Sequence, residues 1–446
     1  MKAFAALILS VYVLTGCVAQ PAPIPVTAHK SPEASQINAI ARDYVKLTLA
    51  MGEKEAGYVD AYYGDPAWAE GAKTDPRSLL ELGNDIISLM GRIDALPVTD
   101  DPLVEARKRF LSAQLEAAHT RHAMISGETL PFVTEAKGLF GVTPAFKPLA
   151  DYDATIATIE ALVPGKGPLH ERVEAYQARF TIPADRLKPV FNAAIAECKS
   201  RTAEHITLPV DENFKMEFVT GKSWSGYNHY QGNFQSLIQI NTDLPIRISR
   251  AVDLGCHEGY PGHHVYNMLL EQRLTRERGW QEFSIYPLYS PQSLIAEGSA
   301  NYGIALAFPG EERLIFERDV LYPLAGLDLA AAADYFELQQ ALSKLKGARF
   351  AIAQAYLDKM ISSEEALGLI QKYQLVSRER AEQSLSFNDQ YRSYVINYGL
   401  GQDMVKAWVE AQGHAPVWRW KAMEKLLSEP MLPGDLAVDL TLDLAE

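Results

Sequence analysis

The stretch His257–His264 has the sequence HEGYPGHH and places three imidazoles and one carboxylate within eight residues. Two imidazoles and a nearby carboxylate are typical of a metal site, and zinc is the usual occupant of such nitrogen and oxygen ligands. Zinc proteases commonly carry H-E-x-x-H, which places two histidines one helical turn apart. Here the residue four positions after His257 is Pro261, and the next histidine is His263.

This spacing requires a broken helix. Six residues of regular α-helix turn by about 600° and rise by about 9 Å, so His257 and His263 would point apart. Pro261 cannot donate a backbone hydrogen bond, Gly262 adopts unusual dihedral angles at low cost, and wide helical turns are common at functional sites. We therefore predict a loosened helix that brings His257 and His263 together as metal ligands, with Glu258 as the general base.

Three further residues near this motif are candidates for roles in the metal site. Glu297 lies in the small and apolar run SLIAEGSANY and is predicted to be the third ligand, because a carboxylate in such a run needs a partner. Asn301 falls on the same helix face and could hydrogen-bond the far nitrogen of a ligand histidine. His264 is expected to point away from the metal, toward substrate or toward the groups that surround the ligands.

HEGYPGHH followed by AEGSANY resembles the bacterial family called domain of unknown function 885, which carries HE-x-x-PGH and then EG-x-A-x-Y. Tyr227–Gly232 and Ile238–Asn241 are similar to the strand segment that precedes the family's metal motif, and Tyr398–Gly401 is similar to its late Y-x-x-G helix. The resemblance extends from about residue 30 to the C-terminus and implies a zinc metallopeptidase whose third ligand is a glutamate. Ser299 stands where the family usually has tryptophan, a departure that concerns substrate choice more than the metal site.

The expected chemistry is metal-assisted hydrolysis of a peptide or a small amide. Glu258 would accept a proton from water and pass it to the leaving amine. The resemblance makes Tyr398 the first candidate for stabilising the oxyanion, and His229 is the second. Two alternatives stay open: a lipid-anchored binding protein that retains the metal without catalysis, and a zinc amidase acting on cell-wall peptide. The chain has neither a G-x-S-x-G elbow nor a P-loop.

Composition restricts the partners. The chain has 446 residues, of which 48% are hydrophobic and 22% charged, and its net charge is −14. This balance is that of an ordinary globular protein, and an acidic chain without a basic stripe is a poor candidate for binding nucleic acid. The sequence does not determine an oligomeric state.

The N-terminus has the features of a bacterial lipoprotein. Residues 1–16 form a short apolar signal peptide, and Leu14–Cys17 resembles a lipobox, with Cys17 as the lipidated residue. Val18 is typical of sorting to the outer membrane, facing the periplasm, and residues 17–33 are proline-rich and predict a tether. Cys198 and Cys256 could form a disulfide in an oxidising compartment, although nothing in the sequence requires one. Cys256 is expected to be a small buried side chain behind the metal helix rather than a ligand or a nucleophile.

The predicted fold is mainly α, a large multi-helix body with a small β-hairpin or sheet beside the metal-binding helix. Residues 34–207 form an N-terminal helical region, and residues 208–446 form a strand segment followed by the metal-binding helices. Residues 214–219 and 236–241 alternate as strands do, with turns expected between them. Residues 127–146 and 279–292 are predicted loops.

Overall fold

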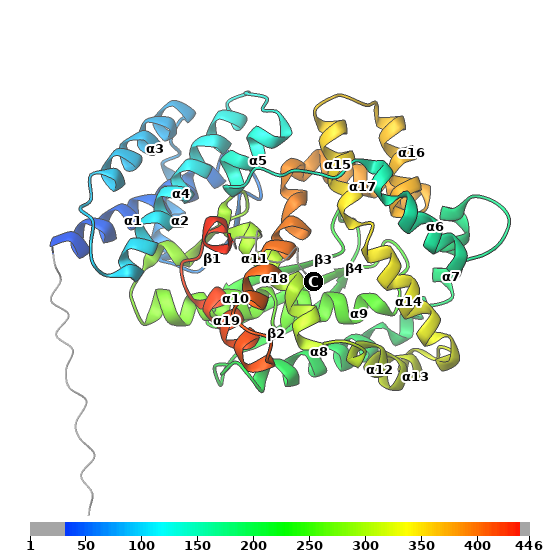
Figure 1. Cartoon of the computed structure of the whole chain (residues 1–446). Helices are drawn as coiled ribbons and strands as arrows, with labels where there is room; N and C mark the ends of the chain where they lie inside the picture. The colour runs from blue at the N-terminus through cyan, green and yellow to red at the C-terminus, as the bar shows by residue number, and fades with distance from the viewer. Residues whose placement is uncertain (1–31, 438–446) are drawn as a thin grey trace, which may run out of the picture.

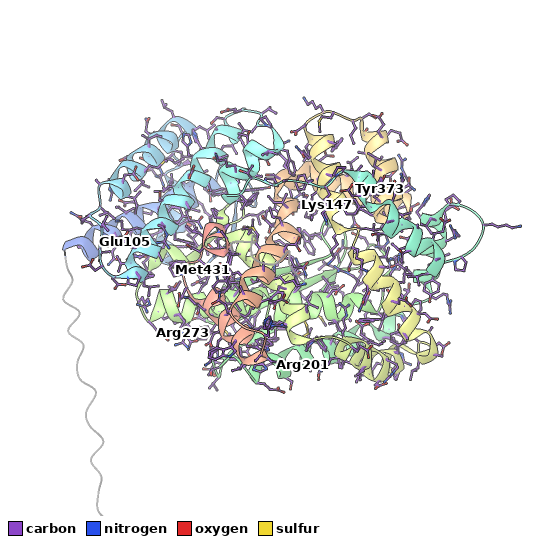
Figure 2. The ribbon with its side chains drawn as sticks, in the orientation of Figure 1. Glu105, Lys147, Arg201, Arg273, Tyr373 and Met431 are labelled. Carbon is purple, nitrogen blue, oxygen red and sulfur yellow. A yellow bond between two sulfur atoms is a disulfide. The ribbon has the colours of Figure 1, made fainter. Side chains whose placement is uncertain are left out.

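A mainly helical architecture is observed in the computed structural model, which describes residues 32–437 (Figure 1). This confirms the predicted fold class. Helices α1–α5 gather on one side of the molecule, helices α14–α17 lie on the other side together with α6 and α7, and a small sheet lies between the two groups (Figure 1). Side chains fill the space between these helices (Figure 2).

The N-terminal half is built from amphipathic helices with defined ends. The N-cap Ser78 accepts a hydrogen bond from the backbone of Glu81, and the Glu81 side chain returns one from the backbone of Ser78, which fixes the start of α3. A helix also occupies part of the predicted loop 127–146, so that prediction was wrong there. The helices are α1 (Pro32–Gly52), α2 (Pro66–Thr74), α3 (Leu79–Asp94), α4 (Pro102–Ile125), α5 (Phe132–Phe140), α6 (Asp153–Leu162), α7 (Leu169–Ala178) and α8 (Leu187–Ala203).

The central sheet has three strands in the order β2–β4–β3. The two predicted strands are present as β2 (Asn213–Val219) and β4 (Gln235–Asn241), but they pair in parallel and therefore do not form a hairpin with each other. The segment between them, expected to be turns, is the strand β3 (Gly226–Gly232), which pairs antiparallel with β4. Aromatic side chains favour this extended segment despite its glycine ends.

A second, two-stranded sheet joins distant parts of the chain. Strand β1 (Val59–Tyr62) pairs antiparallel with β5 (Ile285–Pro287), which lies within the predicted loop 279–292. Strands of three and four residues have too little alternation to be recognised from sequence.

Helices dominate the rest of the chain. They are α9 (Ser249–Leu254), α10 (His263–Leu270), α11 (Pro291–Ala307), α12 (Glu312–Phe316), α13 (Tyr322–Ala325), α14 (Ala332–Ser343), α15 (Lys346–Leu357), α16 (Ser363–Gln374), α17 (Arg378–Tyr391), α18 (Leu400–Ala411) and α19 (Pro416–Ser428). None of the helices within residues 32–437 is long and apolar enough to cross a membrane.

The core connects the N-terminal region to the metal-binding region. The largest buried cluster contains Phe110 of α4 and Phe191 of α8 together with Val265 of α10 and Ile295 of α11. A disulfide between Cys198 of α8 and Cys256 reinforces this connection, with the two Cα atoms 5.5 Å apart. The residues on either side of position 208 therefore share one packed interior. The open question about the cysteines is answered by a bonded pair.

Candidate metal centre

The chain leaves regular helical geometry at the motif, as predicted. After α9, residues Gly255–Gly259 form a π-helical turn, and α10 begins at His263. Residues 260–262 separate the two helical segments, and the peptide bond between Tyr260 and Pro261 is cis. The wide turn and the break together return the chain toward His257.

The break leaves no space for a side chain at position 262. Its N–H donates to the carbonyl oxygen of Cys256 at 3.0 Å, so the returning chain lies directly against the π-helical turn. A Cβ atom on Gly262 would lie 1.7 Å from the carbonyl oxygen of His257, far inside van der Waals contact. Only glycine fits this position without displacing His257 itself.

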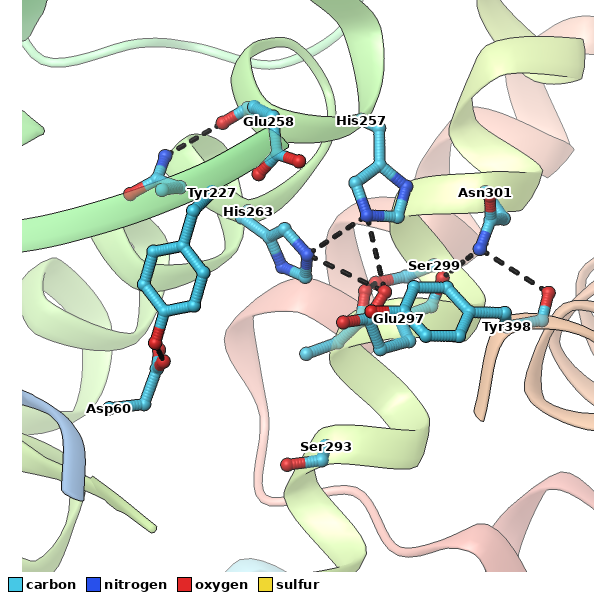
Figure 3. A network of polar contacts seen from close by, with 12 residues as sticks. Asp60, Tyr227, His257, Glu258, His263, Ser293, Glu297, Ser299, Asn301 and Tyr398 are labelled. Atoms are coloured by element: carbon cyan, nitrogen blue, oxygen red, sulfur yellow. Dashed lines mark hydrogen bonds and ion pairs between the residues drawn. The ribbon is translucent and has the colours of Figure 1, made fainter. Parts of the chain in front are cut away.

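The break brings the two histidines together at a carboxylate from another helix (Figure 3). The Nε2 atoms of His257 and His263 lie 3.1 Å apart. Oε2 of Glu297, on α11, lies 3.2 Å from the first of these nitrogens and 3.7 Å from the second. Among residues 32–437, these three form the group whose ligand atoms converge in the manner of a metal site.

The geometry fits a zinc ion. Bonds of about 2.0–2.1 Å in a tetrahedral arrangement place ligand atoms roughly 3.3 Å apart, close to the spacing found here. Oε2 of Glu297 is buried and has no partner in hydrogen-bonding geometry, whereas Oε1 accepts a hydrogen bond from the Tyr394 hydroxyl at 2.7 Å. An unsatisfied buried carboxylate oxygen beside two imidazole nitrogens indicates a cation between them.

The charges of Glu297 and His263 shift each other's pKa values. Burial would by itself raise the pKa of Glu297, but the two histidines more than offset this and lower it. Burial likewise opposes protonation of His263, yet the Glu297 carboxylate raises the pKa of His263 to about 9. The site therefore favours positive charge beside Glu297, which a proton or a metal ion can supply.

Glu258 is buried beside the three ligand residues. Its side chain lines the cavity beside the ligands, and its residue is only 4% exposed. Burial raises the pKa of its carboxyl group. Asn228 of β3 donates to the backbone carbonyl of Glu258 at 2.7 Å, and a Cβ on Gly226 would lie 2.8 Å from its Oε1. Strand β3 thus positions the carboxylate and leaves room for it.

Tyr398 and Asn301 lie beside the ligands. The Tyr398 ring stacks at 6.3 Å from the His257 ring, at an angle of 24°, and its hydroxyl makes no hydrogen bond within the described part of the chain. Asn301 does not reach a ligand nitrogen. It donates instead to the backbone carbonyl of Glu297 at 3.1 Å and to that of Tyr398 at 3.3 Å, which joins two site segments (Figure 3).

Two other candidate histidines face elsewhere. His264 is fully buried on the opposite side of α10, where its Nδ1 lies 2.8 Å from the Ser236 hydroxyl and its Nε2 lies 2.9 Å from Glu212. His229 lies 3.2 Å from the Gln239 side chain across the sheet. Neither residue lines the cavity at the metal group.

Two site residues, Tyr394 and Asp60, escaped the sequence analysis. Tyr394, which holds Glu297, lies one turn before Tyr398, and the repeated tyrosine in YVINY was the available signal. Tyr227 donates a hydrogen bond to Asp60, which burial gives a raised pKa of about 6. Asp60 lies almost 200 residues before the motif in sequence, and no local pattern marks it.

The metal group opens into a cavity of about 800 Å³. One end is formed by the two histidines and Glu297, and the cavity continues between strand β3 and helices α14, α15 and α17. Its volume is in the range of sites for small molecules or short peptides. Cationic side chains line the far part, namely Arg250, Arg313, Lys346, Arg349 and Arg380.

No family model matches the chain, and no curated protein matches it. Two solved structures resemble it. A protein from Colwellia psychrerythraea, provisionally named a lipoprotein, is 15% identical with a TM-score of 0.52, and the alignment covers 91% of this chain and 75% of that one. The chain has the fold of that protein.

A second similar structure is the M32 carboxypeptidase from Deinococcus radiodurans R1. It is 11% identical with a TM-score of 0.47, and the alignment covers 90% of this chain and 93% of that one. A similarity this low supports no functional conclusion, so the function has to be argued from the site.

Proposed function

We propose that the chain is a zinc-dependent hydrolase, a metallopeptidase that cleaves peptide or peptide-like amide bonds. The observation that supports this most strongly is the convergence of His257, His263 and Glu297 at one end of a cavity that Glu258 also faces. Three protein ligands leave a coordination position free, which distinguishes catalytic zinc sites from structural ones.

Zinc held by His257, His263 and Glu297 would polarise the substrate carbonyl and lower the pKa of water. The carboxylate of Glu258 accepts the proton of the attacking water and then donates it to the leaving nitrogen. Its burial suits the first role, because a carboxylate whose pKa is raised by burial is a stronger base than an exposed one. The free hydroxyl of Tyr398 donates to the oxygen on which negative charge develops.

We also propose that the chain is anchored by lipid at Cys17 to the outer membrane and faces the periplasm. Cys17 and the tether up to residue 31 lie outside the described residues, and the helix α1 begins at Pro32, before the predicted end of the tether at residue 33. The lipobox-like LTGC sequence supports the anchor, and the Cys198–Cys256 disulfide supports an oxidising compartment.

The test is Glu258→Gln, with Glu364→Gln, an exposed carboxylate on α16, as the matched control. The Glu258 variant should keep its zinc and its melting temperature and lose at least about 100-fold in peptide hydrolysis. The control should match the wild type. A zinc-loaded wild type that cleaves neither a peptide library nor cell-wall fragments would favour the binding-protein alternative. Cleavage of wall fragments alone would favour the amidase.

A further inference from the structure

Arg349 on α15 is a cation without a counterion. It makes no ion pair or hydrogen bond with any residue in 32–437, and its Nε atom is buried without a partner. Its guanidinium carbon lies 5.3 Å from the centre of the Phe387 ring and 5.8 Å from that of Tyr398. The two rings hold the side chain in the cavity wall but leave its N–H donors free.

The other arginines of the cavity are neutralised. Arg313 contacts Asp253 at 2.8 Å and Glu317 at 2.7 Å, Arg250 contacts Asp253 at 3.3 Å, and Arg380 contacts Glu174 at 3.7 Å. Lys346, one turn before Arg349, also lines the cavity without an ion pair among the described residues, although it is exposed. Unpaired positive charge is therefore concentrated on one face of α15.

A partly buried guanidinium without a partner is costly, and a bound anion relieves the cost. Burial lowers the pKa of Arg349, which reflects the same penalty on its charged form. The planar guanidinium donates two parallel hydrogen bonds to a carboxylate, the anion that every linear peptide with a free C-terminus carries.

The distance from Arg349 to the metal group limits where such a carboxylate can lie. The guanidinium carbon is 5.8 Å from the Tyr398 ring centre, and that centre is 6.3 Å from the His257 ring centre, so the guanidinium lies within about 12 Å of His257. Roughly 4 Å of this distance separates the guanidinium carbon from the bound carboxylate, and roughly 4 Å separates His257 from the scissile carbonyl. Each extended residue spans about 3.5 Å. At most about 4 Å then remains, so a single residue fits between the scissile bond and the carboxylate.

We propose, on the basis of the proposed function, that Arg349 binds the C-terminal α-carboxylate of the substrate. The enzyme is then an exopeptidase that releases a single amino acid from peptide C-termini. Tyr398 lies near both ends of this arrangement, because its ring centre is 5.8 Å from the Arg349 guanidinium carbon and 6.3 Å from the His257 ring centre.

Binding tests this assignment without requiring turnover. The Glu258→Gln protein is immobilised and exposed to a library of N-acetylated pentapeptides, in equal amounts as free acids, as C-terminal amides, and as amides that end in glutamate. Mass spectrometry of the retained fraction should show free acids enriched about 10- to 100-fold over amides, as a charge-assisted pair provides. Adding Arg349→Met should abolish the enrichment, whereas Arg380→Met, which removes a paired arginine of the same cavity, should preserve it.

Equal retention of acids and amides, retention of neither, or enrichment that survives Arg349→Met would overturn the assignment. Equal retention of free acids and glutamate-ended amides would also overturn it, because a side-chain carboxylate would then suffice.

Turnover separates this proposal from the proposed function. The wild type should release the last residue from free acids and cleave the matching amides at least 10-fold more slowly. Cleavage of amides at internal bonds would keep the peptidase and reject the role of Arg349.

Discussion

Gly262 lies against His257 so closely that a single added methyl group would meet the His257 carbonyl oxygen at 1.7 Å. The returning chain is held there by the hydrogen bond from the Gly262 N–H to the carbonyl of Cys256. This contact converts a six-residue spacing into a pair of adjacent imidazoles. The position of the histidines therefore depends on a glycine that carries no chemistry of its own.

Gly262→Ala should accordingly abolish zinc binding, because the methyl group cannot be accommodated unless His257 moves. Gly259→Ala is the matched control in the same turn, since its Cβ would meet only the Phe214 ring, at 3.3 Å. Zinc per chain, measured by plasma mass spectrometry, should fall to near zero in the first variant and stay at the wild-type value in the second. Full zinc occupancy in Gly262→Ala would show that the break is not needed.

Gly298 of α11 allows the backbone of α18 to approach the ligand helix. A Cβ on Gly298 would lie 2.4 Å from the Gly401 carbonyl oxygen, so Gly298→Ala should destabilise the fold by roughly 1–3 kcal/mol through overpacking. Gly71→Ala in α2 meets nothing within 4 Å and should be neutral or slightly stabilising, because alanine favours helix. Urea unfolding measures both variants. Equal urea midpoints for the two variants would contradict the close contact between Gly298 and Gly401.

The disulfide should contribute substantially to stability. Cys198 and Cys256 are 58 residues apart, and cross-linking a loop of this length stabilises by about 4 kcal/mol in the chain-entropy model. Dithiothreitol should lower the urea midpoint of the wild type and leave that of a Cys198→Ala, Cys256→Ala variant unchanged. A reductant that lowers the urea midpoint of both proteins equally, or of neither protein, would contradict the stabilising role of the disulfide.

Acid should weaken the buried cluster behind the metal helix. Burial alone would raise the pKa of Glu212, but hydrogen bonds from His264, Lys199 and Tyr260 lower it from 4.5 to about 2. The folded-state pKa is below the unfolded one, so the stabilisation is present above about pH 4.5 and is lost as pH falls toward 2. It amounts to about 3 kcal/mol.

Glu212→Gln tests this linkage. The difference in unfolding free energy between wild type and variant should be largest at pH 7 and should shrink markedly by pH 3. A difference that is the same at both pH values would mean that folding does not shift the pKa of Glu212.

Local chemistry made the central site predictable from sequence. His257, Glu258 and His263 lie within seven residues, and the proline and glycine between the histidines directly indicate a break. Glu297 was recognisable as a charge in an apolar run. The mainly helical fold followed in the same way from helical periodicity.

Features that depend on distant contacts were not predictable. Asp60 reaches the site through a strand of four residues that pairs more than 200 positions away. Arg349 is notable only because no acidic residue among residues 32–437 forms an ion pair with it. His264 shows the same limit, because adjacency to His263 in sequence says nothing about its burial against Glu212. The parallel pairing of β2 with β4 depends on the intervening strand β3, whose glycine and tyrosine content favoured turns.

The most direct test of the central claim is the zinc content of His263→Gln compared with that of His264→Gln. Both substitutions remove an imidazole from α10, but only His263 faces His257 and Glu297, whereas His264 contacts Ser236 and Glu212. The account predicts one zinc per chain in the wild type and in His264→Gln, and almost none in His263→Gln. Stoichiometric zinc in His263→Gln, or its loss only in His264→Gln, would contradict it.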